Sequence, residues 1–365
     1  MDLPVMPPLL PMLAKPIASV AATAKHGEVL FEPKWDGFRC LIFKDGEEVE
    51  LASRNTKPLT RYFPEVVAAA LEQLPDRCVL DGEIFVALGE PGNQRLEFER
   101  LQDRIHPAKS RVAKLAEETP AGFAAFDLLA LDDTAWIERP LRERRQALEG
   151  ALAGLDGPCF LSRVTTDPDT AQAWFHELEG AGFDGIIAKP LDANYAPNQR
   201  SMFKIKHSRT ADVVLCGYRE HKTSTPENPL IGSLLLGLWD GDSLQHIGVS
   251  ASFTAKRRAE LWQELQPLVC TIDEHPWAAW GAAAIANPDR VPGTQSRWSA
   301  GKDLSFTPLR PERVIEVGYD HMEGRRFRHT AQFKHWRDDR DPKSCTYEQL
   351  EEPTSYDLAK ILSID

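Results

Sequence analysis

A lysine stands at the end of an apolar stretch, directly before a turn. The segment reads Glu32-Pro33-Lys34-Trp35-Asp36-Gly37-Phe38-Arg39. A lysine amine attacks an electrophile only when it is neutral, so its ordinary pKa of about 10.4 must be lowered by neighbouring cations or by desolvation. Taken alone, this pattern fits a surface hairpin better than a covalent catalyst.

Five more short motifs follow this lysine along the chain. They are Ser53-Arg54-Asn55, Leu80-Asp81-Gly82-Glu83-Ile84, Phe126-Asp127-Leu128-Leu129, Asp184-Gly185-Ile186-Ile187-Ala188-Lys189 and Lys204-Ile205-Lys206. Six motifs in this order and at these spacings make chance a poor explanation.

Several of these residues have two readings when they are taken one at a time. Glu83 lies in an apolar stretch, where an unpaired buried carboxylate is costly, so it is either a solvated strand residue or a binding group. Phe126 alone is more often a core residue than a stacking platform. The interval 189–222 is either a solvated basic face or a phosphate site, and its basic residues are Lys189, Arg200, Lys204, Lys206, Arg209, Arg219 and Lys222.

In this order, the motifs resemble the nucleotidyltransferase superfamily of ATP-dependent DNA ligases, RNA ligases and mRNA-capping enzymes. The resemblance extends from Pro11-Met12-Leu13-Ala14 to a late run that looks most like compact bacterial ATP-dependent DNA ligases of the ligase C type. That run comprises Leu309-Arg310-Pro311, Val314, Glu316, Val317, Tyr319 and Arg337-Asp338-Asp339-Arg340-Asp341-Pro342. The resemblance implies an α+β fold with an adenylation domain followed by an OB-fold β-barrel domain.

The resemblance also implies a role for each motif residue. Lys34 would attack the α-phosphate of ATP and form lysyl–AMP, while Phe126 would stack on adenine. The remaining nucleotide contacts would come from Glu32, Arg39, Arg54, Glu83, Arg200, Lys204 and Lys206. Arg39 and Glu83 would contact the ribose, and the basic residues near 200–206 would hold the phosphates and stabilise the departing pyrophosphate.

Two positions depart from the family pattern. Asp184 stands where the family usually has Glu as a ligand or outer-sphere group for a divalent metal. Asp is shorter by one methylene, so the resemblance implies Mg²⁺ or Mn²⁺ held by Asp184 directly or through a water. The family's RxDK reads Arg337-Asp338-Asp339-Arg340, with a planar Arg in place of a compact Lys. The resemblance assigns Arg337 and Arg340 to orienting the pyrophosphate.

The elements that must position these residues follow from hydrophobic patterning. Strands are expected at 28–43 (two, joined at a Gly-containing turn), 78–88, 123–131 and 183–189, and helices near 64–74, 97–104, 141–153 and 169–180. Short strands at 211–218, 230–239, 244–250 and 313–319 with a helix near 254–266 fit a small β-barrel. Loops are expected at 222–229 and 281–300. The domains are expected at 1–206 and 207–365, with a hinge at 204–210.

Composition limits the setting in which the protein works. The 365 residues carry 43 Lys and Arg against 55 Asp and Glu, a net charge of −12, which argues against a uniformly basic surface but not against local basic patches. No apolar run approaches the roughly 18 residues that span a bilayer. The six cysteines are scattered, so reduced thiols in a cytoplasm are expected and a disulfide framework or zinc site is not.

The expected substrate is nicked double-stranded DNA. The stretch 321–340 holds six Lys or Arg against three acidic residues, with Phe327, Phe333 and Trp336 interleaved, and such side chains can replace counterions on phosphates. We expect a monomer that can bind DNA-repair proteins and does not bind a membrane. An RNA ligase, an mRNA-capping guanylyltransferase and a non-catalytic nick-binding module are the alternatives.

Overall fold

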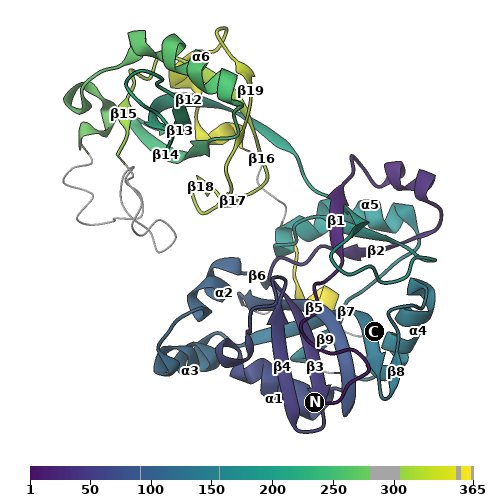
Figure 1. Cartoon of the computed structure of the whole chain (residues 1–365). Coiled ribbons are helices and arrows are strands. Elements are labelled where there is room, and N and C mark those ends of the chain that lie inside the picture. The colour runs from purple at the N-terminus through teal and green to yellow at the C-terminus, as the bar shows by residue number, and fades with distance from the viewer. Residues whose placement is uncertain (91, 156, 280–304, 351–354, 363–365) are drawn as a thin grey trace. The chain divides into compact units, whose positions relative to one another are not determined.

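The structure, a computed structural model, describes residues 1–90, 92–155, 157–279, 305–350 and 355–362 (Figure 1). It divides into two compact units, one of Met1–Lys206 with Pro353–Asp365 and one of His207–Glu352. The sequence expectation placed 207–365 in a single domain. The C-terminal segment instead packs on the first unit, because Leu358 and Ile361 are buried in its core.

The first unit contains a four-stranded sheet with the order β1-β11-β10-β2. Its strands are β1 (Leu13–Pro16), β11 (Arg200–Ile205), β10 (Ile186–Pro190) and β2 (Val29–Pro33). All five residues of β2 are buried, as the run Val-Leu-Phe predicts for a strand covered on both faces. Helix α5 (Pro168–Glu177) packs on β2 and β10, and its N-cap Asp167 accepts hydrogen bonds from the first-turn amides.

A seven-stranded sheet forms the rest of this unit. Its strand order is β4 (Glu48–Ser53), β3 (Phe38–Asp45), β5 (Arg77–Leu88), β7 (Ala121–Leu131), β8 (Thr134–Ala135), with β6 (Arg95–Leu96) on β5 and β9 (Cys159–Leu161) on β7. The helices α1 (Pro64–Gln73), α2 (Phe98–Arg104), α3 (Lys109–Glu118) and α4 (Leu141–Ala151) accompany it (Figure 1). Helix α3 was not expected from the sequence, because Val112 is its one buried residue and the apolar periodicity is weak.

The turn after β2 connects the two sheets. The sequence predicts two strands here, and both are present, but β2 and β3 belong to different sheets and do not form a hairpin. Gly37 is required at this crossing, because a Cβ at that position would collide with the carbonyl oxygen of Ile84. Lys34, the nucleophile expected from the sequence, therefore lies where the chain leaves one sheet for the other.

The second unit is built around a single antiparallel barrel-like sheet, consistent with an OB fold. Its order is β14 (Ser243–Ser250), β13 (Ile231–Asp240), β12 (Arg209–Glu220), β16 (Val314–Tyr319), β19 (Gln332–Trp336), with β15 (Thr307–Pro308) on β12. Helix α6 (Ala255–Leu265) buries Leu261 and Leu265 against this core. The hairpin of β17 (Met322–Glu323) and β18 (Arg326–Phe327), together with β19, occupies a stretch that is too polar to reveal strands by alternation. The expected loop at 281–300 lies outside the described residues.

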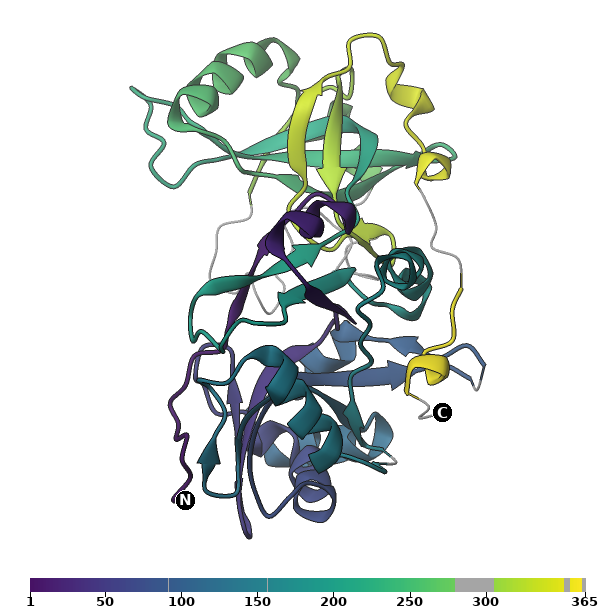
Figure 2. The same cartoon turned by 90° about the vertical axis from the view of Figure 1, so that its right-hand side faces the viewer.

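Short helical turns complete the two units. Short 3₁₀-helices occur at Ala21–His26, Thr60–Tyr62, Leu178–Ala181, Gln266–Leu268, Ile272–Glu274, Pro276–Ala279, Pro342–Ser344 and Tyr347–Gln349. The C-terminal helix α8 (Ala359–Leu362) belongs to the first unit (Figure 2). Leu358, the residue before it, donates its backbone N–H to the carbonyl of Gln94.

All six cysteines are free thiols, and five of them are buried. Burial raises the pKa of Cys78 and of Cys159 to about 12, so both thiols stay protonated. Among the helices that the structure describes, none has the length and apolar character to cross a bilayer.

Candidate active site

Strand register in the four-stranded sheet brings three charged side chains together. Pro33 of β2 lies opposite Ile186 of β10, and Ile186 lies opposite Ile205 of β11. Residues just beyond these three aligned positions must emerge at the same edge of the sheet. The residues delivered there are Lys34, Asp184 and Lys206.

One carboxylate oxygen joins the two lysines. The Nζ atom of Lys34 lies 2.5 Å from Oδ2 of Asp184, and the Nζ atom of Lys206 lies 2.7 Å from the same oxygen. The Lys34 side chain is 22% exposed and that of Asp184 only 8%. Burial, together with the charges of Lys206 and Lys34, lowers the pKa of the nearby Lys204. The edge is therefore a concentrated cationic site with one internal counterion.

Backbone contacts fix the approach of Lys34 to Asp184. The amide of Lys34 donates to the carbonyl of Gly185 at 2.8 Å, and the amide of Asp184 donates to the carbonyl of Lys34 at 2.9 Å. Gly185 has φ +111° and sits so close to Ile205 that a Cβ would collide with the Ile205 carbonyl oxygen. Glycine is thus required at the centre of the Asp-Gly motif, and the positions of both side chains depend on it.

A second ion pair is buried next to this edge. Nζ of Lys189 lies 2.8 Å from Oε1 of Glu32, and both side chains are less than 5% exposed. Burial raises the pKa of Glu32, although the neighbouring Lys189 opposes that shift. The other carboxylate oxygen, Oε2, is buried and has no hydrogen-bond partner among the described residues. A buried acceptor without a donor is costly, so this oxygen is available to a ligand.

Two cations contact the ring of Phe126. The guanidinium of Arg39 and the ammonium of Lys189 each lie 4.5 Å from the ring centroid. The ring is only 4% exposed and belongs to a cluster with Trp35 and Phe85. Phe126 is therefore a core residue whose ring also contacts two cations.

Arg39 is held by a carboxylate in the seven-stranded sheet. Its Nε and Nη2 atoms lie 2.5 and 2.6 Å from the two oxygens of Asp81, and the hydroxyl of Tyr195 donates to the same carboxylate at 2.6 Å. Burial alone would lower the pKa of Arg39, but the charge and hydrogen bonds of Asp81 outweigh this effect and the net pKa is raised. The guanidinium is therefore permanently charged. The fork geometry leaves the orientation of Arg39 little freedom.

Glu83 lies directly across the strand pair from Arg39. Burial raises its pKa to about 8, although Arg39 and Lys34 act in the opposite direction. The carboxyl group therefore holds a proton over much of the neutral range and can donate as well as accept a hydrogen bond.

The remaining predicted residues of this unit lie further out. Arg54 is exposed just beyond the end of β4, and Arg200 is exposed at the start of β11, where it donates to the carbonyl of Ala14 at 3.3 Å. The structure therefore gathers Glu32, Lys34, Arg39, Glu83, Phe126, Asp184, Lys204 and Lys206 around one place. Arg54 and Arg200 are exposed cations outside this group.

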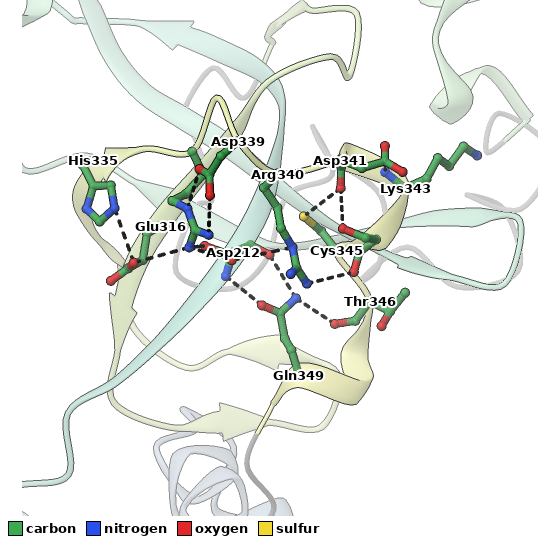
Figure 3. Close-up of polar contacts among 12 residues, drawn as sticks. Asp212, Glu316, His335, Asp339, Arg340, Asp341, Lys343, Cys345, Thr346 and Gln349 are labelled. Carbon is green, nitrogen blue, oxygen red and sulfur yellow. Dashed lines mark hydrogen bonds and ion pairs between the residues drawn. The ribbon is translucent and has the colours of Figure 1, made fainter.

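Arg337 and Arg340 lie in the second unit. Figure 3 shows Arg340 in a cluster of charged side chains. Arg337 pairs through Nε and Nη2 with both oxygens of Asp339 at 2.9 Å, and through Nη1 with both oxygens of Asp212 at 3.0 Å. These partners raise the pKa of Arg337, and the hydrogen bonds to Arg337 lower the pKa of Asp339 to about 2. Arg340 donates to the carbonyl of Ser344 at 3.3 Å.

Sequence reasoning assigned no role to three residues that organise the site. Lys189 closes the apolar run Ile186-Ile187-Ala188, and a lysine there is a signal that could have been used, since buried lysines require partners. Asp81 shares its motif with Glu83. Tyr195 gave no signal, because it meets Asp81 across 114 residues of sequence.

A divalent cation would need more than protein ligands at this site. In the part of the chain that the structure describes, no three His, Cys, Asp or Glu side chains are grouped so as to hold a metal. Mg²⁺ commonly binds through one or two carboxylates together with substrate phosphates and waters. Asp184 is a buried carboxylate beside Lys34 and Lys206, and it fits a metal ion that binds together with the phosphates of a nucleotide.

Comparison with family models matches both parts of the chain. Residues 11–206 match a model described as an ATP dependent DNA ligase domain, and residues 227–340 match one described as an ATP dependent DNA ligase C terminal region. The first match alone covers more than half of the chain.

Individual relatives match over nearly the full length. The chain is 59% identical to DNA ligase C2 of Mycolicibacterium smegmatis, over 97% of each chain, and 54% identical to DNA ligase C of Mycobacterium tuberculosis, over 99% of each. A solved structure of a Lig E DNA ligase, 16% identical, superposes with a TM-score of 0.53 over 90% of this chain and 99% of that one. At that identity the structural match speaks for the fold alone.

Proposed function

The chain belongs to the ATP-dependent DNA ligases, and we propose that Lys34 is the residue that carries AMP between ATP and DNA. The observation that supports this assignment is the position of its amine, at the edge where three strands meet and 2.5 Å from Asp184. Asp184 orients the amine, and Lys204 and Lys206 stand beside it as binding groups for phosphate.

In the first step, the Lys34 ammonium gives up a proton to water, and the neutral amine attacks the α-phosphorus of ATP, losing a second proton as the phosphoramidate forms. The new N–P bond forms as the bond from the α-phosphorus to the bridging oxygen breaks, and pyrophosphate leaves with that electron pair. Lys204 and Lys206 stabilise the negative charge that grows on the leaving group. AMP then passes to the 5′-phosphate at a nick as its N–P bond to Lys34 breaks, and the 3′-hydroxyl on the other side of the nick displaces AMP to form the phosphodiester.

The nucleoside would be held by the residues next to Lys34. The unpartnered Oε2 of Glu32 can accept a hydrogen bond from an exocyclic amine, and Glu83 and Arg39 can bond the ribose hydroxyls. Adenine would stack on Phe126 in competition with the two cations that now contact the ring. Arg54 and Arg200, both exposed, remain available to the nucleotide from the surface.

Asp184 would hold Mg²⁺, or Mn²⁺, through a carboxylate oxygen or an intervening water. When bound with ATP, the ion would neutralise phosphate charge. The Lys34 and Lys206 ammonium groups already neutralise the charge of the Asp184 carboxylate. The ion and these lysines would therefore share this carboxylate.

Arg337 and Arg340 would orient the pyrophosphate during the first step, and the 204–210 segment would act as the hinge that allows the second unit to close and reopen. Nicked double-stranded DNA is the proposed substrate, contacted by the basic stretch 321–340. DNA repair as a cytoplasmic monomer is the proposed setting. RNA ligation, mRNA capping and nick binding without catalysis are less favoured.

Intact mass after incubation with ATP and Mg²⁺ tests the assignment of Lys34. An increase equal to one AMP is expected for the natural chain, and peptide mapping should place it on Lys34. Adenylation of any other residue would show that the nucleophile has been misassigned, although the chain would still be a ligase.

A further inference from the structure

Two carboxylates of the second unit face each other across neighbouring strands. Asp212 of β12 is the register partner of Glu316 of β16, and Glu316 is in turn the partner of His335 of β19. Like charges directly opposite each other destabilise a sheet unless a cation lies between them. The structure places Arg337 there, with Nη1 3.0 Å from Asp212 and 3.8 Å from Glu316.

The two carboxylates that bind Arg337 most closely differ in exposure. The side chain of Asp212 is 13% exposed, whereas that of Asp339 is 69% exposed. Asp339 occupies the Nε–Nη2 edge of the guanidinium, which is the edge that pairs bidentately with carboxylates and phosphates. An incoming phosphate can therefore replace Asp339 at little desolvation cost, while Asp212 keeps its hold on Nη1.

The backbone of Asp212 is itself held by the side chain of Gln349. Its amide donates to Oε1 of Gln349 at 2.7 Å, and Nε2 of Gln349 donates to the Asp212 carbonyl at 3.0 Å (Figure 3). Its carboxylate also lies 3.7 Å from Nε of Arg340, a buried nitrogen with no hydrogen-bond partner in the described ranges. One anchored carboxylate thus faces both arginines.

We propose that Asp212 is a positioning residue that holds Arg337 and Arg340 in the orientation that lysyl–AMP formation requires. Asp212 lies on the strand that follows Lys206 and the 207–208 connection, so the same segment carries a phosphate-binding lysine and the support for both arginines. This inference rests on the proposed role of those arginines in orienting pyrophosphate.

The test compares single-turnover rates in the full-length protein. Asp212→Asn keeps the shape of the side chain but removes its charge, and we expect lysyl–AMP formation to slow by at least about tenfold, with sealing of a pre-adenylated nick nearly unchanged. Asp212→Glu, which keeps the charge, should recover much of the rate. Reversal of lysyl–AMP by added inorganic pyrophosphate should need a higher pyrophosphate concentration in Asp212→Asn.

Asp338→Asn is the matched control, because Asp338 pairs with Arg313 at 3.0 Å and is 79% exposed. It should leave all three measurements unchanged. Asp212→Asn added to the Arg337→Ala/Arg340→Ala pair should slow adenylation no further, because Asp212 has no positioning role once both arginines are removed.

The outcomes separate the inference from the function on which it rests. Slow adenylation in Arg337→Ala with a normal rate in Asp212→Asn would overturn only the role of Asp212. A normal rate in Arg337→Ala would overturn the role of the arginine and the inference with it. Equal losses in adenylation and sealing, together with a lower melting temperature, would reduce Asp212 to a structural residue.

Discussion

Lys34 and Asp184 are separated by 150 positions in the chain, yet their side chains meet at 2.5 Å. The contact is a product of sheet register, because each residue lies just outside a pair of aligned strand positions. Lys206 reaches the same carboxylate oxygen, so removal of Asp184 would leave two ammonium groups facing each other. Of these three side chains Asp184 is the acidic one, so it balances the charges of both Lys34 and Lys206.

Replacing Lys34 by Arg should abolish self-adenylation. The guanidinium stays protonated at any working pH and cannot act as a nucleophile. Incubation with radiolabelled ATP should give no labelled protein, while the thermal unfolding and the binding of nicked DNA should remain close to those of the natural protein. Persistent labelling would show that the covalent residue lies elsewhere.

Asp184→Asn should slow the first step by at least about tenfold, because an amide cannot balance two ammonium groups. Sealing of a pre-adenylated nick should suffer less if the effect acts mainly through the orientation of Lys34. The measurement is the rate of lysyl–AMP formation at several Mg²⁺ concentrations. Asp36→Asn, a change of the same kind two positions from Lys34, is the control and should have little effect.

Phe126→Ala should weaken ATP use through loss of a stacking face, worth on the order of 1–3 kcal/mol by analogy with base–aromatic contacts. Because the ring is buried, the substitution should also lower stability by about 3–5 kcal/mol. Phe126→Leu keeps most of the buried volume and serves as the comparison. If both variants use ATP normally below their melting temperatures, Phe126 is only a core residue.

Glu83→Gln should stabilise the nucleotide-free protein more at pH 8 than at pH 5. The unfolded chain releases the Glu83 proton near the ordinary pKa of 4.5, but the folded chain keeps it up to a pKa of about 8. Between these values the unfolded state binds fewer protons, so rising pH favours unfolding. Each pKa unit corresponds to about 1.4 kcal/mol, and a gain of at least that size at pH 8 is expected. Melting temperatures of both proteins across this range give the answer; parallel curves would contradict the prediction.

Leu358→Ala should destabilise the first unit by about 2–5 kcal/mol, because this side chain is fully buried in the cluster that contains Trp35 and Phe126. Lys360→Ala, two residues further on, should have almost no effect. Denaturant unfolding of both variants measures the difference. Equal stability would mean that the tail does not dock in solution.

Much of the fold could be predicted from the sequence, because apolar runs such as 78–88 and 123–131 are buried strands with strong patterning. The motifs also identified most of the charged residues that meet at the candidate site. What the sequence could not supply was pairing at long range: β2 and β3 look like a hairpin locally, and only the sheets to which they belong show otherwise.

The residues that support the site residues could not be predicted from the sequence either. Tyr195 and Gln349 have no local pattern that marks them, since their role comes from a contact more than 100 residues away. Strand β19 escaped notice because its residues are mostly polar and partly exposed, and alternation carries little signal at such an edge.

The return of the chain to the first unit has a consequence for the order of events during synthesis. Asp357 accepts a hydrogen bond from the amide of Gln94, 263 residues earlier, and the intervening sequence includes the whole of His207–Glu352. A ribosome therefore finishes the second unit before it supplies Leu358 and Ile361, which complete an apolar cluster beside Lys34. Until then the emerging first unit keeps that apolar surface uncovered, and closing so long a loop is among the slowest kinds of contact to form. The apolar cluster that contains Trp35 and Phe126 is therefore complete only after the unit that precedes Leu358 in the chain has been made.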